Sequence, residues 1–274
     1  MNPILFFRRL WAFVVRDWRL ELSYRMQLFL RVISILIVVT TLFFISKIFT
    51  GFTDPRFTQW RDPLAAWLTG LAVLNYFMTG FSSLANAIRQ EQVQGTLESV
   101  LMTPINVPTV IVASSAWDFV QATFFSFLYL FFGWMFFDVH YRGSYLLALA
   151  FLLLTTIVLS CLGILSASFA MVFKRGDPFG VFLGAGSALF SGVFFPTQLI
   201  RDYAGGAAQI SRLLPPTYGL DGIRRVLIEG QGFSDVRAPL VTLLGFLVVL
   251  LPVSLWVFGR AIRRAKREGS LIQY

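Results

Sequence analysis

Long runs of residues without a charged side chain set the limits on how this chain can fold. Five of them exceed the roughly 18 apolar residues that mark a candidate membrane-spanning helix. A sixth, Val32–Ser46, is shorter and lies between Arg31 and Lys47, whose long side chains can reach the two membrane interfaces. We therefore expect an all-α membrane protein with six transmembrane helices. The five longer runs are Leu64–Ile88, Phe119–Phe137, Gly143–Phe173, Phe179–Ile200 and Ala238–Gly259.

The composition supports the same class. Hydrophobic residues make up 57% of the 274 residues and charged residues only 14%, against about 25% charged residues in typical soluble domains. The formal net charge of +9 would suit nucleic-acid binding in a soluble protein, but here the basic residues flank apolar runs. We interpret them as determinants of membrane orientation. No linker separates a second unit, so residues 1–274 are expected to form a single transmembrane domain.

Basic residues also predict how the chain lies in the membrane. With six spans, both termini share one side with the loops that follow the second and fourth spans. Of the 23 Lys and Arg residues, 14 fall on that side, and five of these lie in the tail from Arg260 to Arg267. Because cytoplasmic loops carry an excess of basic residues, both termini are predicted to be cytoplasmic.

The N-terminal segment, residues 1–25, is interrupted by too many charges to span a membrane. On a helix, Trp11 and Trp18 fall in one apolar stripe, while Arg16 and Arg19 lie together on another face. This pattern is typical of an amphipathic helix in the plane of the membrane interface. A soluble amphipathic helix that packs on a partner protein is the alternative.

A polar island, residues 91–105, separates two of the longest apolar runs. Gly95 predicts a break in the helix that leaves the second span, Thr96 can cap a new short helix, and Pro104 ends it. A short amphipathic helix at a membrane surface can dock into a groove of a soluble partner. An ordinary cytoplasmic loop on the lipid headgroups is the alternative. The residues expected at a docking contact are Glu91, Gly95, Thr96, Leu97, Glu98 and Leu101.

The long segment between the last two spans, residues 196–237, is rich in proline and glycine. Within it, Leu213–Ile223 is too short and too broken to span, but it can dip into the outer leaflet. Irregular backbone at that depth must be covered by protein or line a cavity. A surface loop with two amphipathic turns is the alternative.

Two further features lie inside expected spans. Gly180, Gly184, Ala188 and Gly192 recur at four-residue spacing, which suits close helix packing more than a substrate path. Asp118 is the one acid placed within a span, and an intramembrane carboxylate is a functional candidate. Pairing of Asp118 with an N-terminal arginine is the alternative explanation.

Catalysis by this chain has little support. The one histidine, His140, falls in a turn on the expected outer side, and the one cysteine, Cys161, lies within a span. A zinc site needs several His, Cys or carboxylate ligands, and a nucleophile needs a nearby base. The chain also lacks the glycine-rich, lysine-ended loop that cradles nucleotide phosphates. We therefore expect no enzymatic activity and no cofactor in this chain.

Three motifs together resemble those of ABC type-2 exporter permeases. Glu91-Gln-Val-Gln-Gly-Thr-Leu-Glu98 followed by Met102-Thr-Pro-Ile105 is similar to the E-x-x-x-G-T-L-E element and the T-P-hydrophobic element of that family. Ser191-Gly-Val-Phe-Phe-Pro196 and Leu214-Pro-Pro-Thr-Tyr-Gly-Leu-Asp-Gly-Ile-Arg224 resemble its second half. The resemblance covers essentially the whole chain.

The resemblance implies a role for each unusual segment. The island would be a coupling helix that contacts a separate ATP-binding subunit, and that subunit would hold ATP and magnesium. Two permease chains, identical or paralogous, and two ATPase chains would form the working unit in a prokaryotic cytoplasmic (inner) membrane. Gln92-Val-Gln94 replaces a charge found in many relatives, which bears on charge pairing with the ATPase. The outer segment would form re-entrant helices at the exit of the pathway, with Phe195, Pro196, Pro215, Pro216 and Tyr218 at the gate.

The function implied by the resemblance is ATP-driven export of an amphipathic or hydrophobic substrate, such as a drug, lipid-like molecule or natural product. The G-T-L-E form of the island resembles the drug and lipid branch more than the branch that exports polysaccharide or lipo-oligosaccharide, which stays an alternative. An ion-coupled carrier is a further alternative, although it would normally show several intramembrane ionisable residues. A membrane enzyme or a non-transporting scaffold is the third class.

Overall fold

The computed structural model describes residues 11, 14–19, 21–50, 62–93, 107–173, 178–195 and 205–267. Nearly all of this part is helical, and no strand occurs in it, so the expected all-α class is confirmed. Short helical stretches at 14–19 and 21–23 precede the longer helices. In chain order these are α2 (Arg25–Thr50), α3 (Pro63–Val93), α5 (Val107–Phe137), α6 (Tyr145–Phe173), α7 (Pro178–Phe190), α9 (Gly205–Leu213), α10 (Pro215–Leu227) and α11 (Arg237–Arg267).

Five helices of the described part are long and apolar enough to cross a membrane: α2, α3, α5, α6 and α11. They coincide with five of the six expected spans. Two of their ends coincide with residues that favour a helix boundary: Pro63 is the first residue of α3, and Lys47 lies in the last turn of α2. The protein is therefore a multi-pass helical membrane protein.

The apolar run that starts at Phe179 differs from the prediction. Its described residues, which end at Phe195, form the single helix α7. The 13 residues of α7 rise about 20 Å, less than the roughly 30 Å of a hydrocarbon core. Gly192, two residues beyond the end of α7, has a φ of 85°, a conformation that favours glycine and ends helices. The expected span over Phe179–Ile200 is therefore not one continuous helix, because α7 ends at Phe190, and a count of six membrane-spanning helices stays a prediction.

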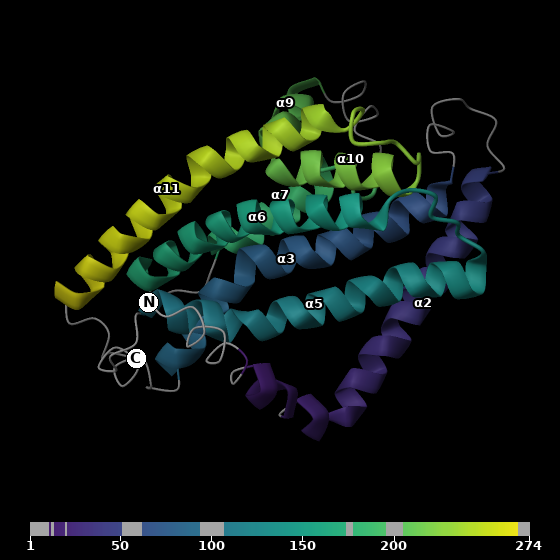
Figure 1. Cartoon of the computed structure of the whole chain (residues 1–274). Helices are drawn as coiled ribbons and strands as arrows, with labels where there is room; N and C mark the ends of the chain where they lie inside the picture. The colour runs from purple at the N-terminus through teal and green to yellow at the C-terminus, as the bar shows by residue number, and fades with distance from the viewer. Residues whose placement is uncertain are drawn as a thin grey trace.

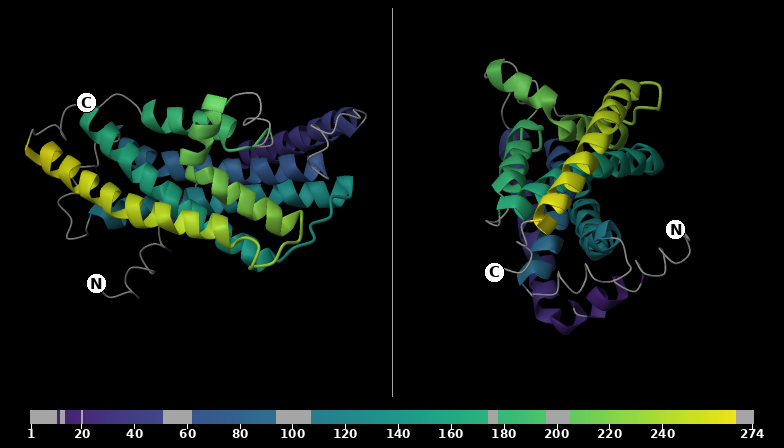
Figure 2. Two further views of the ribbon diagram at one scale, coloured as in Figure 1. Left: turned by 90° about the horizontal axis from the view of Figure 1, so that it is seen from above. Right: turned by 90° about the vertical axis from the view of Figure 1, so that its left-hand side faces the viewer.

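The helix α3 lies at the centre of the bundle. It packs along α5 on one side and α6 on the other; α6 in turn packs on α11, and α2 packs mainly on α5 (Figure 1). Of the five long helices α3 is the most buried, while α2 and α11 are the least buried. The two views of Figure 2 place α11 at the edge of the bundle, against α6 and α10.

Glycine allows α3 and α6 to approach within backbone contact. A Cβ atom built at Gly163 of α6 would lie 2.2 Å from the carbonyl oxygen of Gly80 on α3. Small residues at a crossing point are the usual means by which membrane helices pack closely. The core beside this crossing is apolar, and its fully buried side chains include Phe77, Phe81, Phe151, Leu220 and Leu243.

Because successive long helices run in opposite directions, the ends of the bundle can be told apart by which helix termini lie there. The C-terminal end of α3, the N-terminal end of α5 and the C-terminal end of α6 lie at the left in Figure 1. We call this the inner end, following the predicted orientation, and the opposite end the outer end. The short helices α9 and α10 lie toward the outer end, over α6 and α7 (Figure 1).

Candidate functional site

The N-terminal segment contacts the inner part of α5. The ring of Trp18 meets the ring of Trp117 edge to face, with centroids 5.7 Å apart. Trp11 is exposed, and Arg16 is paired with Asp17, with 2.7 Å between Nε and Oδ1. Arg19, also exposed, accepts a hydrogen bond at its carbonyl from Ser23. The segment thus packs on its own transmembrane domain while exposing tryptophan; its place at the membrane interface stays a prediction.

Most of the expected coupling residues lie outside the described part. Glu91 belongs to the last turn of α3, whose final residue is Val93. The predictions for Gly95, Thr96, Leu97, Glu98 and Leu101 fall on residues 94–106, beyond it. The fold nevertheless places the two boundaries of this segment, Val93 and Val107, at the same end of the bundle.

At the outer end, Arg224 of α10 binds the backbone of two other elements. Its Nη2 donates to the carbonyl oxygens of Ala66 (2.8 Å) and Val193 (3.0 Å), and its Nη1 donates to that of Gly192 (2.5 Å). A second bond to Ala66 comes from Nε at 3.3 Å. We call this set of contacts the outer latch. It joins the start of α3, the turn after α7 and α10.

The outer latch brings the two halves of the second-half motif together. Gly192 and Val193 belong to the Ser191–Pro196 stretch, and Arg224 ends the Leu214–Arg224 stretch. Trp67 of α3 adds a bond from its indole Nε1 to the carbonyl oxygen of Phe194, at 3.0 Å. Carbonyls that follow a helix end have no partner within the helix and need outside donors, and a guanidinium supplies five N–H donors in a fixed plane.

The helix α10 fits against α6 through two glycines. A Cβ atom at Gly219 would lie 2.2 Å from Oγ1 of Thr155, and one at Gly222 would lie 2.3 Å from Cε1 of Phe151. The spacing of three on α10 and four on α6 places each pair on facing helix sides. Eight of the 13 residues of α10 are buried, so this short helix is an internal part of the domain.

The residues expected at the outer gate lie in α10 and in the turn after α7. Pro215 and Pro216 occupy the first turn of α10 and are buried, and Tyr218 donates to the carbonyl of Arg212 at 2.9 Å, which fixes the junction with α9. Phe195 is exposed after the turn, and Pro196 lies outside the described residues. The structure has a short helix that begins at Pro215, and the expected re-entrant insertion of this segment stays a prediction.

The glycine stripe of the fifth apolar run is only partly a helix face. Gly180 and Gly184 are buried in α7, and a Cβ atom at Gly184 would lie 2.8 Å from the sulfur of Met78 on α3. Gly192 does not share that face, because α7 ends at Phe190 and Gly192 lies in the following turn. Its assignment to helix packing is thus corrected: its carbonyl belongs to the outer latch.

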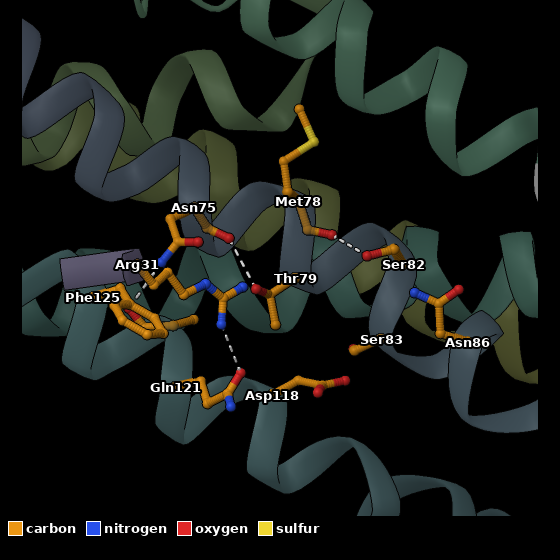
Figure 3. Close-up of a pocket in the computed structure, with 11 residues that line it drawn as sticks. Arg31, Asn75, Met78, Thr79, Ser82, Ser83, Asn86, Asp118, Gln121 and Phe125 are labelled. Carbon is orange, nitrogen blue, oxygen red and sulfur yellow. Dashed lines mark hydrogen bonds between the residues drawn. The ribbon is translucent and has the colours of Figure 1, made fainter. Parts of the chain in front are cut away.

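In the inner half, polar side chains of α2, α3 and α5 line a cavity of about 260 Å³ (Figure 3). Asp118 projects from α5 toward the side of the cavity where Ser83 of α3 lies. Among the described residues, Asp118 forms no ion pair with an arginine, and the alternative of pairing with an N-terminal arginine falls partly on residues outside the described part. The lining consists of Arg31, Asn75, Met78, Thr79, Ser82, Ser83, Asn86, Asp118, Gln121, Ala122 and Phe125. We call this cavity the inner pocket.

One wall of the inner pocket was readable from the sequence and was missed. Asn75, Thr79, Ser82 and Asn86 recur at spacings of four, three and four, which places them on one face of α3. A polar stripe on a membrane-spanning helix faces protein or a water-filled cavity. The stripe was missed because its polar residues are dispersed along a mostly apolar run. No group of three or more metal-ligating side chains occurs in the described part.

The fold and these sites define a class: a multi-pass helical membrane protein in which short outer helices pack onto a central span. A comparison with protein families then shows that the chain belongs to the ABC-2 type transporter family, matched over residues 8–228. A comparison with curated proteins finds no match. The protein is therefore the membrane permease subunit of an ABC transporter, and the family implies association with an ATP-binding subunit.

Proposed function

We propose that this chain is the permease of an ATP-driven exporter that moves an amphipathic or hydrophobic substrate out of the cytoplasm or inner leaflet. Two permease copies and two ATPase subunits form the working unit in a prokaryotic cytoplasmic membrane, with both termini and residues 91–105 on the ATPase side. ATP and magnesium bind to the partner. Drug-like or lipid-like cargo fits the many apolar side chains of the chain, which has 30 phenylalanines.

The observation that carries this proposal is the continuity of α3. Its first turn accepts the outer latch at Ala66, and its last turn ends at Val93, where the expected coupling segment begins. These residues are separated by about 40 Å at 1.5 Å per residue. One continuous helix thus connects the expected ATPase contact with the helix α10 at the outer end, so a push at one end can reach the other.

Coupling mutants test the proposal. In proteoliposomes that contain the permease and its ATPase, Gly95→Pro or Glu98→Lys should leave assembly intact but abolish substrate-stimulated ATP hydrolysis and export. The reason is that a ligand-driven transition requires different contacts in its two states, and these changes remove them at the input. Export at the normal rate by both variants would contradict the coupling assignment.

The inner pocket favours one other candidate, an ion-coupled carrier, because an intramembrane carboxylate is a typical proton or ion site. The same proteoliposomes distinguish the two. Export that needs ATP and persists when an ionophore collapses the proton gradient supports the exporter. Export that continues without ATP and stops with the ionophore supports the carrier.

A further inference from the structure

Within the described residues, the carboxylate of Asp118 in the inner pocket forms no ion pair. Asp17, Glu21 and Arg31 lie within electrostatic reach of Asp118. Asp17 is paired with Arg16. In the described part, Arg31 is the one basic group that offsets the negative charge of Asp118, while Asp17 and Glu21 add to it. A charge of one sign in a membrane protein interior is costly unless an opposite charge compensates it.

Arg31 is directed to other groups. Its Nη1 donates to Oε1 of Gln121 at 3.3 Å, and its guanidinium lies over the ring of Phe125, 4.5 Å from the centroid. Gln121 in turn donates from Nε2 to Oε2 of Glu21 at 2.5 Å. Arg31, Gln121 and Glu21 thus form a connected chain along one wall, and Asp118 stands outside it (Figure 3). Among the described residues Asp118 has no hydrogen bond of its own.

The opposite wall offers acceptors. Thr79 donates its hydroxyl proton to the carbonyl of Asn75 (2.9 Å), and Ser82 donates to the carbonyl of Met78 (2.7 Å). Each proton points back along α3, so the oxygen lone pairs stay available to a ligand. Ser83 is 2% exposed, lines the pocket, and its Oγ has no partner in the described part. The acceptors on the α3 wall and the carboxylate of Asp118, which has no hydrogen bond in the described part, together suit a donor with positive charge.

We propose that the inner pocket binds the ammonium group of an amphipathic amine, with Asp118 as counter-ion and Ser83 as a hydrogen-bond acceptor. An ammonium provides three N–H donors and no acceptor. The cavity of about 260 Å³ holds the head of such a molecule but not a long chain, so the apolar tail lies outside it. Exported cargo and a resident aminophospholipid are two sources of this headgroup, and only the first rests on the proposed function.

Photo-labelling tests the site directly. The full chain, in nanodiscs of phosphatidylcholine and phosphatidylglycerol, is irradiated with a diazirine derivative of dodecylamine, and labelled peptides are located by mass spectrometry. We expect saturable labelling of α3 and α5 near the pocket that dodecylamine, but not dodecanol, displaces. Asp118→Asn should weaken apparent affinity about 10- to 100-fold, the range for losing a hydrogen bond to a charged group. Asp118→Glu, which keeps the carboxylate, should retain binding better than Asp118→Asn.

Two control variants keep the result interpretable. Asp138→Asn, at the exposed outer end of α5, removes the same charge and should leave labelling unchanged. Ser83→Ala should weaken labelling without changing thermal stability, because its hydroxyl has no partner in the described part to lose. Wild-type affinity in Asp118→Asn, or equal displacement by dodecanol, would overturn the proposal. Wild-type affinity in a folded Ser83→Ala variant would show that Ser83 does not accept a hydrogen bond from the ammonium group.

The source of the ammonium group is decided separately. If dodecylamine stimulates the ATPase of the reconstituted complex and is exported, the pocket recognises cargo. If it binds without stimulation, and nanodiscs with phosphatidylethanolamine block the labelling, the pocket holds a lipid headgroup. If ATP-driven export is normal but labelling does not depend on Asp118, the proposed amine site is wrong and the proposed export function stands. If labelling depends on Asp118 but no ATP-driven export occurs, the proposed export function is wrong and the proposed amine site stands.

Discussion

At the scale of single residues, the outer end of the domain depends on Arg224. Burial lowers the pKa of its guanidinium to about 9, which leaves it charged at neutral pH. Its donors are shared among the carbonyls of Ala66, Gly192 and Val193, which come from two elements far apart in the sequence. Lysine carries one nitrogen on a flexible stem and cannot reproduce this planar arrangement.

Arg224→Lys should therefore lower the stability of the domain and impair export. Carbonyls left without a donor cost about 1–3 kcal/mol each when buried, so we expect a clearly lower melting temperature in detergent. The matched control is Arg225→Lys, because Arg225 forms only a partly exposed pair with Asp221 on the same helix, a kind of contact worth about 0–1 kcal/mol. Equal melting temperatures for the two variants would show that the outer latch contributes no stability.

At the scale of elements, the position of α10 is set by what its glycines permit. Gly219 and Gly222 leave room for Thr155 and Phe151 of α6 at distances that no other residue allows. Helical glycine is otherwise unfavourable by about 1 kcal/mol relative to alanine. Its presence twice on one face of a 13-residue helix therefore indicates selection for close packing over helix propensity.

Replacing glycine by alanine should consequently change the stability of the domain differently at two positions. Gly222→Ala places a methyl group into Phe151 and should destabilise the domain by about 1–3 kcal/mol, the usual cost of overpacking. Gly206→Ala in α9, where nothing lies within 4 Å, should be neutral or slightly stabilising. Thermal unfolding of both variants, with trypsin accessibility of the outer segment as a second measurement, checks this. A neutral Gly222→Ala would mean that α10 is not held against α6.

Which elements the sequence could predict follows from where their signals lie. The five long spans were predictable because apolar length and flanking Pro, Arg or Lys are local properties, as Pro63 and Lys47 show. The end of α7 was missed because Gly192 fitted a periodic stripe as well as it fits a turn. The latch and the inner pocket depend on which helices pack together, so Arg224 and Asp118 appeared as isolated residues without their partners.

At the scale of the whole molecule, α3 connects the features that matter. It carries the acceptor of the outer latch in its first turn and the glycine crossing with α6 at Gly80. The polar wall of the inner pocket runs from Asn75 to Asn86, on both sides of that crossing. The less buried α2 and α11 lie at the edges, where lipid or a second copy would contact them. An impulse applied after Val93 would thus act on the pocket and the outer end through one helix.

The central claim, that energy enters through residues 91–105 from a separate ATP-binding subunit, is tested most directly by site-specific cross-linking. A photoreactive amino acid at Leu101 in the assembled complex should give a covalent adduct with the ATPase subunit, while the same group at Phe233, exposed in the outer loop before α11, should give none. An adduct from Phe233, or none from Leu101 in a complex that hydrolyses ATP, would contradict the account.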